Sequence, residues 1–452
     1  MKKLLVVGMI ILLVGMSIPS TGINVERTST VSYDGKTLYV GGSGSGNYTR
    51  IQDAIDDSSS GDTVFVYNGT YYEHIVINVS ISLIGENKHS TIIDGSKSGH
   101  VILVLNPIIT IKDFTIQNSG TGCWYRGFEL DNENNDIKSI YISECIIKLN
   151  SGGIRLNNAS NISISNCWIN NNSCSSVGIW AYSNNVSITD CSIDRNGEFL
   201  GGGWLHPGGI FLGSPDLYSR SNIIISGCEI KNIIGDGITA KRSNNLNILN
   251  NNIYNNTMYG ISISSNCNQV EIHNNIIHYN YKDGVYISGA GTNLSNISIY
   301  NNTIINNMEN GSFIQYVSNA VIMEGNIFSS NNLNGIYLLR SKYNFIRGNE
   351  IVLNEDNGIK FEESNSNTII GNNFHSNKND GIHLLYSHKN TITKNNFLNN
   401  SQDTYISLSF LNQWKQNYWN GPRLLPKLIF GRVGPFPWIN VDWHPAKEPY
   451  DI

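Results

Sequence analysis

The most regular feature of the sequence is a short pattern in which a glycine precedes an apolar, a variable and a second apolar residue. It begins at Gly127, has a degenerate copy at Gly311, and otherwise recurs at Gly153, Gly178, Gly209, Gly237, Gly260, Gly284, Gly335, Gly358 and Gly381. The base unit is about 23 residues, the interval from Gly335 to Gly358, and longer intervals mark insertions. Apolar and polar residues alternate in each copy, as in a half-buried strand. A fixed period of this length indicates a solenoid of stacked coils.

Each unit also holds a second segment of the form I-x-x-N-x-I, as in ISNCWI from Ile164 and IRGNEI from Ile346. These segments are rich in Ile and Asn and are interrupted by Gly or Asn-Asn turns, which excludes a helix. Strands this short bury their apolar side only when coils stack about 4.8 Å apart. We therefore predict an all-β, single-domain, right-handed parallel β-helix of about a dozen coils. A leucine-rich repeat shares the period, but Ile replaces Leu here and no helical segment separates the strands.

The fourth position of the second segment supports this alignment. It is occupied by Cys, then by Asn with one interruption, in the order Cys145, Cys167, Cys191, Cys228, Asn251, Asn275, Asn302, Gly325, Asn349, Asn372 and Asn395. Parallel coils place identical side chains above one another, where Asn amides can form a hydrogen-bonded ladder. We expect the Cys residues to be buried, unpaired thiols that act as small hydrophobic groups.

The two ends of a solenoid need caps, because each would otherwise expose the core. Before the first coil, Ile51, Ala54 and Ile55 fall on one face of a predicted helix with Thr49 as its N-cap. After the last coil, the repeat gives way to a tail rich in Trp and Pro. We assign residues 37–410 to the β-helix and residues 411–452 to an irregular aromatic C-terminal cap.

The first residues predict export from the cytoplasm. Lys2 and Lys3 precede an apolar run from Leu4 to Met16, which is too short for a typical transmembrane helix of about 20 residues and suits a signal sequence. We expect a signal peptide over residues 1–22, with a retained N-terminal anchor as the alternative. The chain is therefore expected to be secreted or held at the cell surface, and not otherwise to be an integral membrane protein.

Composition narrows the choice of partner. Charged residues make up 14% of the chain, against about 25% in ordinary domains, and the net charge is -5. No basic stretch resembles a nucleic-acid footprint, so we do not expect DNA or RNA as a partner.

Several of these segments resemble a known family. The opening, YTRIQDAIDDSSSGDTVFVYNGTYYEHIVI, and later coils such as NGIYLLRSKYNFIRGNE resemble the NosD-type repeat proteins within the wider pectin-lyase-like group of carbohydrate-binding and sugar-hydrolase β-helices. The resemblance covers about Thr37 to Ser409 and implies the fold and a polysaccharide or glycan partner. The C-terminal tail is similar to the ending of secreted archaeal proteins, which implies an archaeal origin. The NosD label also suggests copper; thiolates suit Cu(I), but burial opposes their ionisation.

The resemblance does not extend to the catalytic signatures of the group. The sequence lacks the polygalacturonase quartet, and it lacks the DPHD string of epimerases, to which LHPGG at Leu205 comes nearest. The same repeat occurs in lyases, hydrolases, epimerases and binding proteins, so the fold alone does not give the activity.

Two surface regions are candidate sites. The first is the outward position two residues after each repeat glycine, where aromatic faces suit sugar rings; the ligand-binding candidates are Arg155, Trp180, Phe211, Tyr286, Tyr337, Lys360 and His383. The second is the insertion and its neighbouring coil over residues 194–242, with the catalytic candidates Asp194, His206 and Arg220. Such a set, aided by Ca²⁺, would suit a polysaccharide lyase or hydrolase. The aspartates before Gly, at Asp236, Asp283 and Asp380, are more simply explained as turn residues.

Three functions therefore remain open. The first is carbohydrate binding on an exposed strand face. The second is cleavage of a polysaccharide through the 194–242 region. The third is a structural or adhesion solenoid without a small ligand.

Overall fold

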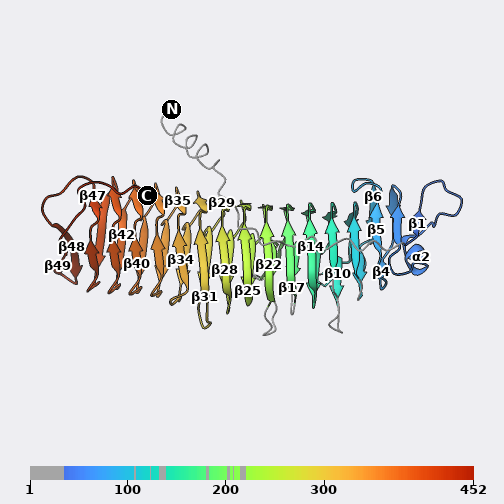
Figure 1. The fold of residues 1–452 in the computed structure, drawn as a ribbon, viewed down its shortest axis with the longest axis horizontal. Helices are drawn as coiled ribbons and strands as arrows, with labels where there is room; N and C mark the ends of the chain where they lie inside the picture. Colours follow the sequence, from blue (N-terminus) through green and yellow to red (C-terminus); the bar gives the residue numbers. More distant parts are fainter. Residues whose placement is uncertain are drawn as a thin grey trace, which may run out of the picture. The chain divides into compact units, whose positions relative to one another are not determined.

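The computed structural model describes residues 35–105, 108–122, 124–131, 139–179, 183–200, 204–206, 208–213 and 220–452. The expected signal peptide and Trp180 lie outside these residues. Figure 1 shows the strands of the described unit side by side in one long row, with every coil turning the same way. Each coil contributes one strand to each of three sheets, and every strand pairs in parallel with the equivalent strand of the next coil.

The strands that open each coil make the first sheet. They are β4 (Ile75–Ile77), β7 (Ile102–Val104), β10 (Arg126–Asp131), β13 (Gly152–Asn157), β16 (Val177–Ile179), β21 (Ile210–Leu212), β24 (Ile238–Lys241), β27 (Ile261–Ser264), β30 (Val285–Ser288), β33 (Ser312–Gln315), β36 (Ile336–Leu339), β39 (Ile359–Glu362), β42 (Asp380–Leu385), β45 (Gln402–Ser407) and β48 (Lys427–Val433).

The next strand of each coil belongs to the second sheet. Its members are β1 (Thr37–Val40), β2 (Thr63–Val66), β5 (Ser82–Gly85), β8 (Ile109–Lys112), β11 (Ile140–Ser143), β14 (Ser160–Ser165), β17 (Asn184–Thr189), β22 (Arg220–Ser226), β25 (Ser243–Leu249), β28 (Asn268–His273), β31 (Ser295–Tyr300), β34 (Val321–Glu324), β37 (Phe345–Arg347), β40 (Thr368–Ile370), β43 (Thr391–Thr393), β46 (Gln413–Lys415) and β49 (Phe436–Asp442).

The third sheet closes each coil. Its strands are β3 (Gly69–Tyr71), β6 (Thr91–Asp94), β9 (Thr115–Gln117), β12 (Ile146–Lys148), β15 (Trp168–Asn170), β18 (Ser192–Asp194), β23 (Glu229–Lys231), β26 (Asn252–Tyr254), β29 (Ile276–His278), β32 (Thr303–Ile305), β35 (Ile327–Ser329), β38 (Glu350–Val352), β41 (Asn373–His375), β44 (Asn396–Leu398) and β47 (Tyr418–Trp419). A separate antiparallel pair, β19 (Glu198–Leu200) and β20 (Trp204–His206), lies in the insertion.

The predicted parallel β-helix is confirmed, with two corrections. The third sheet alone stacks 15 strands, so the estimate of about a dozen coils was too low. The count followed the repeat glycines, which the first coils lack, although these coils, such as the one containing β5, lie within the predicted range of 37–410. Each coil also has three strands, whereas the pattern predicted two. The segment I-x-x-N-x-I forms the corner between the second and third sheets. Its first Ile, such as Ile164, lies in the second-sheet strand β14, and its last, Ile169, lies in the third-sheet strand β15.

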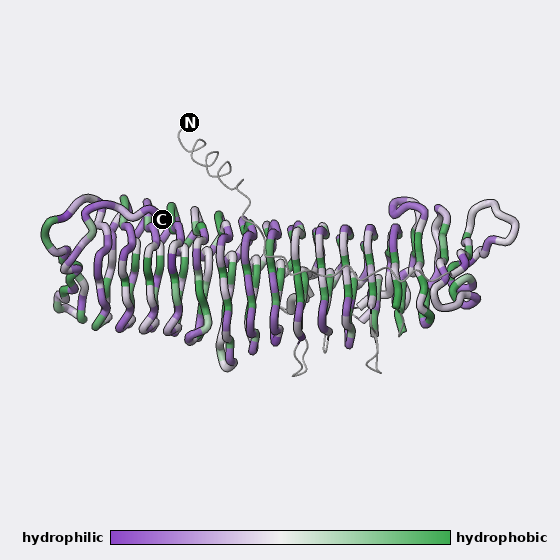
Figure 2. The backbone as a smooth tube through the Cα atoms, viewed as in Figure 1, coloured by the Kyte–Doolittle hydropathy of each residue, from purple (hydrophilic) through white to green (hydrophobic). Residues whose placement is uncertain are grey.

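The core follows directly from the alternation of residue types. Figure 2 shows apolar and polar residues alternating along each coil. In each strand the alternate Ile, Val, Leu or Phe side chains are buried, as with Ile336 and Leu338 in β36. The repeat glycine before each first-sheet strand has a steric role. A Cβ on Gly335 would lie 2.7 Å from the carbonyl oxygen of Gly358 in the next coil, so a larger residue would push the coils apart.

The predicted Asn ladder occupies the corner between the second and third sheets. Each Asn Nδ2 donates to the Oδ1 of the next coil, for example from Asn302 to Asn326 at 2.9 Å. The interruption expected at Gly325 was wrong, because the ladder residue there is Asn326. Gly325 precedes it with a φ of 63°, a left-handed conformation that Asn and Gly adopt most readily. This conformation explains the recurrent Asn-Asn and Gly-Asn pairs.

A second Asn ladder, which the sequence did not reveal, occupies the corner that leads from the third sheet back to the first. It comprises Asn150, Asn172 and Asn196 in the earlier coils and, after Ile233, Asn256, Asn280, Asn307, Asn331, Asn354, Asn377 and Asn400. Both ladders satisfy backbone groups that the tight corners bury. Asn280 Nδ2, for instance, also donates to the carbonyl of Ile253.

Five cysteines confirm the expectation of buried, unpaired thiols: Cys145, Cys167, Cys191, Cys228 and Cys267. Cys174 is an exception, because it is disulfide-bonded. A hydrogen bond with the Cys145 side chain, together with burial, raises the pKa of Cys167. The thiol ladder joins the Asn ladder at Cys228, whose backbone N–H donates to Asn251 Oδ1 at 2.9 Å.

The helical N-terminal cap is present as α2 (Ile51–Asp56), with Ile51, Ala54 and Ile55 buried. The predicted N-cap was wrong: the residue at that position is Arg50, and its side chain forms no capping hydrogen bond. Instead, the buried carboxylate of Glu73 accepts from the backbone N–H groups of Ile51 and Gln52, at 2.9 and 3.1 Å. A residue 22 positions along the chain therefore satisfies the first turn of the helix.

The C-terminal end is capped by two coil strands and a hairpin. Parallel stacking continues past residue 410 into β46 and β47, and β48 and β49 then pair antiparallel. Trp414 and Trp419 are buried and cover the core, as the sequence predicted for the tail. Trp443, by contrast, is 66% exposed. Buried Asp442 ends the Asn ladder by accepting from the backbone N–H of Asn417 and from Trp419 Nε1, at 2.9 and 3.1 Å.

Candidate functional site

The outward position of the first sheet forms one column of side chains along the solenoid. The strand register places one residue per coil in this outward column, in the order Glu129, Arg155, Gly178, Phe211, Thr239, Ser262, Tyr286, Phe313, Tyr337, Lys360, His383 and Tyr405. One predicted member was misaligned. Gly178, and not Trp180, pairs with Arg155 and Phe211. Gly178 lies inside the strand, two residues after the position that the repeat glycine occupies in other coils. Counting from it therefore shifted the predicted outward residue by two positions.

Aromatic rings in this column stack on one another. The rings of Phe313 and Tyr337 are parallel within 6° at a centroid distance of 4.6 Å, and those of His383 and Tyr405 are 4.6 Å apart at 20°. The ring of Tyr259, from the preceding corner, lies 4.3 Å from that of Tyr286. The ring faces therefore cover each other, and the expectation of flat, open rings for sugar stacking was wrong for these pairs. A ligand would meet ring edges and hydroxyl groups.

The C-terminal part of the column carries ionisable groups in mutual contact. His383 Nδ1 lies 2.8 Å from Asp380 Oδ2, which fixes the imidazole and leaves Nε2 on the other side of the ring. In the preceding coil, Lys360 Nζ lies 4.9 Å from the centroid of the Tyr337 ring and 3.4 Å from Glu362 Oε2. The hydroxyl of Tyr337 donates to the same Glu362 oxygen at 2.7 Å, and this bond lowers the pKa of Glu362.

The Asp380–His383 pair was missed in the sequence, although both residues were noted separately. The signal is the string Asp-Gly-Ile-His, which places the carboxylate before the repeat glycine and the imidazole in the outward column. The same geometry recurs at Asp236, whose Oδ2 accepts from the Thr239 hydroxyl at 2.8 Å. Burial raises the pKa of Asp236.

In the N-terminal half of the outward column, the side chains contact charged groups of the protein. Arg155 Nε lies 2.6 Å from buried Glu129 Oε1, so its charge is paired within the protein. Phe211 lies beneath Lys241, whose Nζ is 6.0 Å from the ring centroid. Thr239 and Ser262 follow, so the outward column carries no aromatic ring between Phe211 and Tyr286.

The structure does not bring the three catalytic candidates of the insertion into a described cluster. Asp194 ends β18 in the third sheet, where its carboxylate accepts from Asn232 Nδ2 at 2.6 Å and pairs with Arg195 at 2.9 Å. Arg220 is fully buried at the start of β22, and its guanidinium donates to the carbonyls of Ile179 and Lys241. His206 belongs to β20, and its side chain lies outside the described residues.

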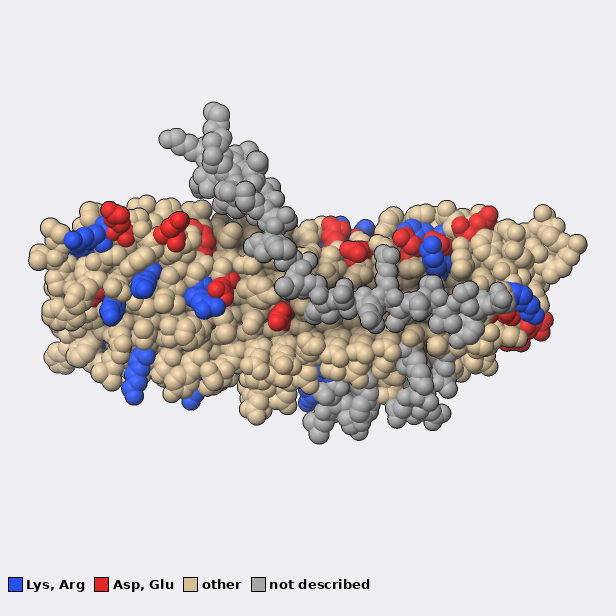
Figure 3. Space-filling model, in the orientation of Figure 1, with Lys and Arg blue, Asp and Glu red and all other residues tan. Residues whose placement is uncertain are grey.

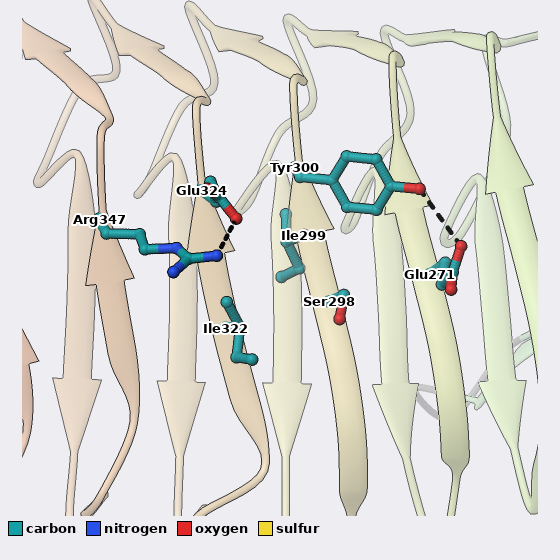
Figure 4. Close-up of a pocket in the computed structure, with 7 residues that line it drawn as sticks. All are labelled: Glu271, Ser298, Ile299, Tyr300, Ile322, Glu324 and Arg347. Atoms are coloured by element: carbon teal, nitrogen blue, oxygen red, sulfur yellow. Dashed lines mark hydrogen bonds and ion pairs between the residues drawn. The ribbon is translucent and has the colours of Figure 1, made fainter. Parts of the chain in front are cut away.

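A shallow depression of about 320 Å³ lies on the second sheet, away from the outward column. Its floor is Ser298, a small residue between Glu271 and Ile322 in the same outward row. Figure 4 shows its charged groups satisfying one another: Tyr300 bonds to Glu271 on one side, and Arg347 pairs with Glu324 on the other. This internal pairing makes the depression a weaker candidate than the column.

Asp283 is a second carboxyl group near the column whose pKa is raised. It is fully buried; Oδ1 accepts two hydrogen bonds from Asn310, whereas Oδ2 has no hydrogen-bond partner among the described residues. Burial raises its pKa to about 7. The equivalent positions of later coils hold Asn310, Asn334 and Asn357, which continue the hydrogen-bonded row. Asp283 thus begins a row of three amides that ends at another acidic residue, Asp380, whose backbone N–H donates to Asn357 Oδ1 at 3.1 Å.

Two family descriptions match separate parts of the chain. The family of the periplasmic copper-binding protein (NosD) matches residues 308–425, and the right-handed β-helix region matches residues 173–296. No curated protein matches the chain.

The described residues do not fit a copper site. Across the ranges given above, no group of three or more His, Cys, Asp or Glu side chains is placed to hold a metal ion. The stacked thiols are buried, and the pKa of Cys167 and that of Cys191 are raised, which disfavours the thiolate that Cu(I) would require. No helix of the described residues is long and apolar enough to cross a membrane.

Solved structures with the same fold cover most of the chain. A double mutant of the periplasmic alginate epimerase AlgG aligns with a TM-score of 0.50 at 15% identity, over 81% of this chain and 83% of that one. The Siphovirus 9NA tailspike receptor binding domain aligns with a TM-score of 0.52 at 11% identity, over 87% and 79% of the two chains. Together with the three-sheet coils and the two family matches, these likenesses show that the chain has the right-handed parallel β-helix fold.

Proposed function

We propose that the chain is an extracellular protein that binds carbohydrate along the outward column of the first sheet, from Tyr286 to Tyr405. The observation that carries this proposal is the unbroken run of large side chains, one per coil, in which Tyr286, Phe313 and Tyr337 precede Lys360, His383 and Tyr405. Coils repeat about every 4.8 Å. A glycan lying along the axis would therefore meet a new side chain at each step.

The chemistry of the column suits hydroxylated ligands. Stacked rings present hydroxyl groups and edges, and Lys360 and the fixed imidazole of His383 add a donor and an acceptor. The stacking also holds the rings in place before a ligand arrives, which lowers the entropic cost of binding. Few charged side chains cover the face of the molecule shown in Figure 3, so the surface in view is largely uncharged.

The comparisons are consistent with this proposal. One neighbour in fold is named as an alginate epimerase and another as a tailspike receptor binding domain, and the first of these acts on a polysaccharide. An extracellular location is supported by the disulfide at Cys174, because such bonds persist in oxidising compartments. The apolar run from Leu4 to Met16, which suits a signal sequence, also supports an extracellular location.

The test is binding of the purified chain to a panel of neutral and acidic polysaccharides, measured by affinity electrophoresis. We expect retardation by at least one polysaccharide, weakened by His383→Gln and by Tyr337→Ala. Lys342→Met is the matched control, because Lys342 is an exposed side chain at a corner near the column but outside it. This variant should bind as the wild type does.

Assays of the reaction mixtures separate the alternatives. New reducing or unsaturated ends would show cleavage, and variants at Asp194 and His206 would then test the insertion as its source. Absence of retardation and of new ends across the panel would refute carbohydrate binding and favour a structural solenoid.

A further inference from the structure

The basic side chains in the later part of the outward column are paired with carboxylates of the protein. Lys360 Nζ lies 3.4 Å from Glu362 Oε2. In the next coil, His383 Nδ1 lies 2.8 Å from Asp380 Oδ2. At both positions a basic group and a carboxylate therefore stand side by side, and the positive charge is balanced within a few ångströms.

The same pairing is found in the rest of the column and at its edges. Arg155 Nε lies 2.6 Å from Glu129 Oε1 in the earlier coils. At the corner that leads from the first sheet to the second, Arg340 forms two hydrogen bonds with Glu363, at 2.8 and 3.1 Å. These arginines are therefore also balanced by an acid before any ligand arrives.

The wider surroundings carry no excess of positive charge. Residues 282–452, which include the later column and the whole C-terminal cap, contain 13 Lys and Arg residues and 13 Asp and Glu residues, so their formal net charge is zero with His neutral. Beyond Tyr405, Lys427 Nζ lies 3.0 Å from Asp403 Oδ2. A polyanion approaching this half of the solenoid would therefore meet no net attractive field.

The row beside the column is also almost uncharged. The next outward residues of the same strands, two positions further on, are Ser264, Ser288, Gln315, Leu339, Glu362, Leu385 and Ser407. Glu362 is the one charged member of this row, and it is the partner of Lys360. Hydroxyl, amide and apolar groups therefore flank the rings, and they can contact the hydroxyl groups and C–H faces of sugars.

A ligand carboxylate gains little from such pairs. When it approaches Lys360 it also approaches Glu362, and repulsion from the acid offsets much of the attraction to the ammonium group. A sugar hydroxyl meets no such conflict, because it can donate to the carboxylate and accept from the ammonium group. Each pair is thus better suited to a hydroxyl group than to an anion.

From these pairings we infer that the outward column from Tyr286 to Tyr405 selects uncharged polysaccharides over polysaccharides that carry a carboxylate on each sugar. The inference rests on the proposed carbohydrate binding and adds the class of ligand to it. It also assigns a role to Glu362, which prevents Lys360 from attracting acidic chains.

The test compares polymers that share a backbone and differ in charge. Two such pairs are methyl-esterified and de-esterified homogalacturonan, and hydroxyethyl- and carboxymethyl-cellulose; both pairs join the panel for affinity electrophoresis of the full chain. We expect neutral polysaccharides alone to retard the protein, with an affinity at least about tenfold above that for acidic ones. Binding should change less than about twofold between about 20 and 500 mM NaCl, because it uses no unpaired charge.

A charge variant tests the cause of this selection. Glu362→Gln keeps the shape of the side chain and leaves Lys360 without its acid, so at low salt the variant should bind acidic polysaccharides at least about tenfold more tightly than the wild type does. Salt should abolish this gain. Glu324→Gln is the matched control, because it releases Arg347 on the second sheet, outside the column. It should leave acidic polysaccharides unbound.

The outcomes separate this inference from the proposed function. Binding of an acidic polysaccharide as tight as that of neutral ones, weakened by His383→Gln, would overturn the inference and leave carbohydrate binding intact. A Glu362→Gln variant that gains no affinity for acidic chains would also overturn it, because the pairing would then not be the cause. Absence of retardation by every polysaccharide would refute the proposed function itself, and the inference with it.

Discussion

The coils before and after residue 240 have the same three strands but differ in the side chains at their corners and in the outward column. In the earlier coils the corner between the second and third sheets holds thiols such as Cys167, an insertion containing β19 and β20 interrupts the repeat, and the outward column passes through Gly178. In the later coils the same corner holds amides such as Asn349, and the column carries a run of rings. The later coils are also nearly uniform in length.

The difference shows how buried hydrogen bonds at the corners determine the arrangement of outward side chains. Each ladder Asn donates to the Asn of the next coil and accepts from the Asn of the preceding coil, so it fixes the spacing and register of adjacent coils. Uniform register brings outward residues of successive coils into contact, as with Phe313 and Tyr337. A thiol is a weaker donor and acceptor, and it mainly fills space. The later coils therefore present a regular column of outward side chains.

The largest expected effect comes from removing one amide of the later ladder. In Asn349→Leu, the side chain and backbone of Asn326 lose their acceptor, and the carbonyl of Met323 loses its donor, all in the core. Each buried group left without a partner costs about 1–3 kcal/mol. We expect the free energy of unfolding in urea to fall by about 3 kcal/mol or more. A loss below about 1 kcal/mol would contradict the structural role of the ladder.

A pH-dependent effect is expected from Asp283→Asn. Because the pKa is about 7 in the folded protein and near 4 in the unfolded chain, the folded state holds the proton more tightly. The wild type therefore loses stability as the pH rises from about 4 to 7, by up to about 1.4 kcal/mol per pH unit. The variant should be more stable than the wild type at pH 7.5 and close to it at pH 4, as measured by thermal unfolding. Equal differences at both pH values would show that Asp283 does not titrate in this range.

A binding comparison between the two halves follows. Lys360→Met removes a cation from the run of rings, and we expect the affinity for the glycan identified by the panel to fall about tenfold, or about 1.4 kcal/mol. Arg155→Met, in the earlier half, should lower it less than twofold, because Arg155 is paired with Glu129. Titration calorimetry measures both. Equal losses would place the ligand along the whole column.

The smallest effect is expected in the thiol ladder. Cys167→Ala removes one buried sulfur and leaves no strong hydrogen-bonding group without a partner, so the free energy of unfolding should fall by only about 1 kcal/mol. Urea unfolding beside Asn349→Leu gives the comparison directly. A loss as large as that of the Asn variant would mean that the thiols form a ladder of similar strength.

The fold was predictable because its signals repeat. Alternation and the repeat glycine gave the strands, the parallel stacking and the first ladder. The third strand was missed because it is only three residues long and follows a corner with a left-handed residue such as Asn250, so it merged with its neighbour in the pattern. The second ladder was hidden for a similar reason: Asn256 follows another Asn at a corner, in a chain where Asn is frequent.

The candidate site was predictable in position and less so in geometry. Column members such as Lys360 and His383 were found from spacing alone. The mutual stacking of Phe313 and Tyr337 depends on side-chain direction, and the cap on α2 depends on Glu73, a residue distant in the sequence. The misalignment at Gly178 arose because a strand interior there contains a glycine. Such features depend on contacts between coils, which a linear pattern does not record.

The central claim, that ligand binds along the later part of the outward column, is tested most directly by side-chain footprinting. The full chain would be labelled with a carbene reagent with and without the polysaccharide it binds, and the modified residues identified by mass spectrometry. The account predicts protection of Tyr337, Lys360, His383 and Tyr405, with Arg155 and the second-sheet residue Tyr300 unchanged. Protection confined to Tyr300 and its neighbours, or to the earlier coils, would contradict it.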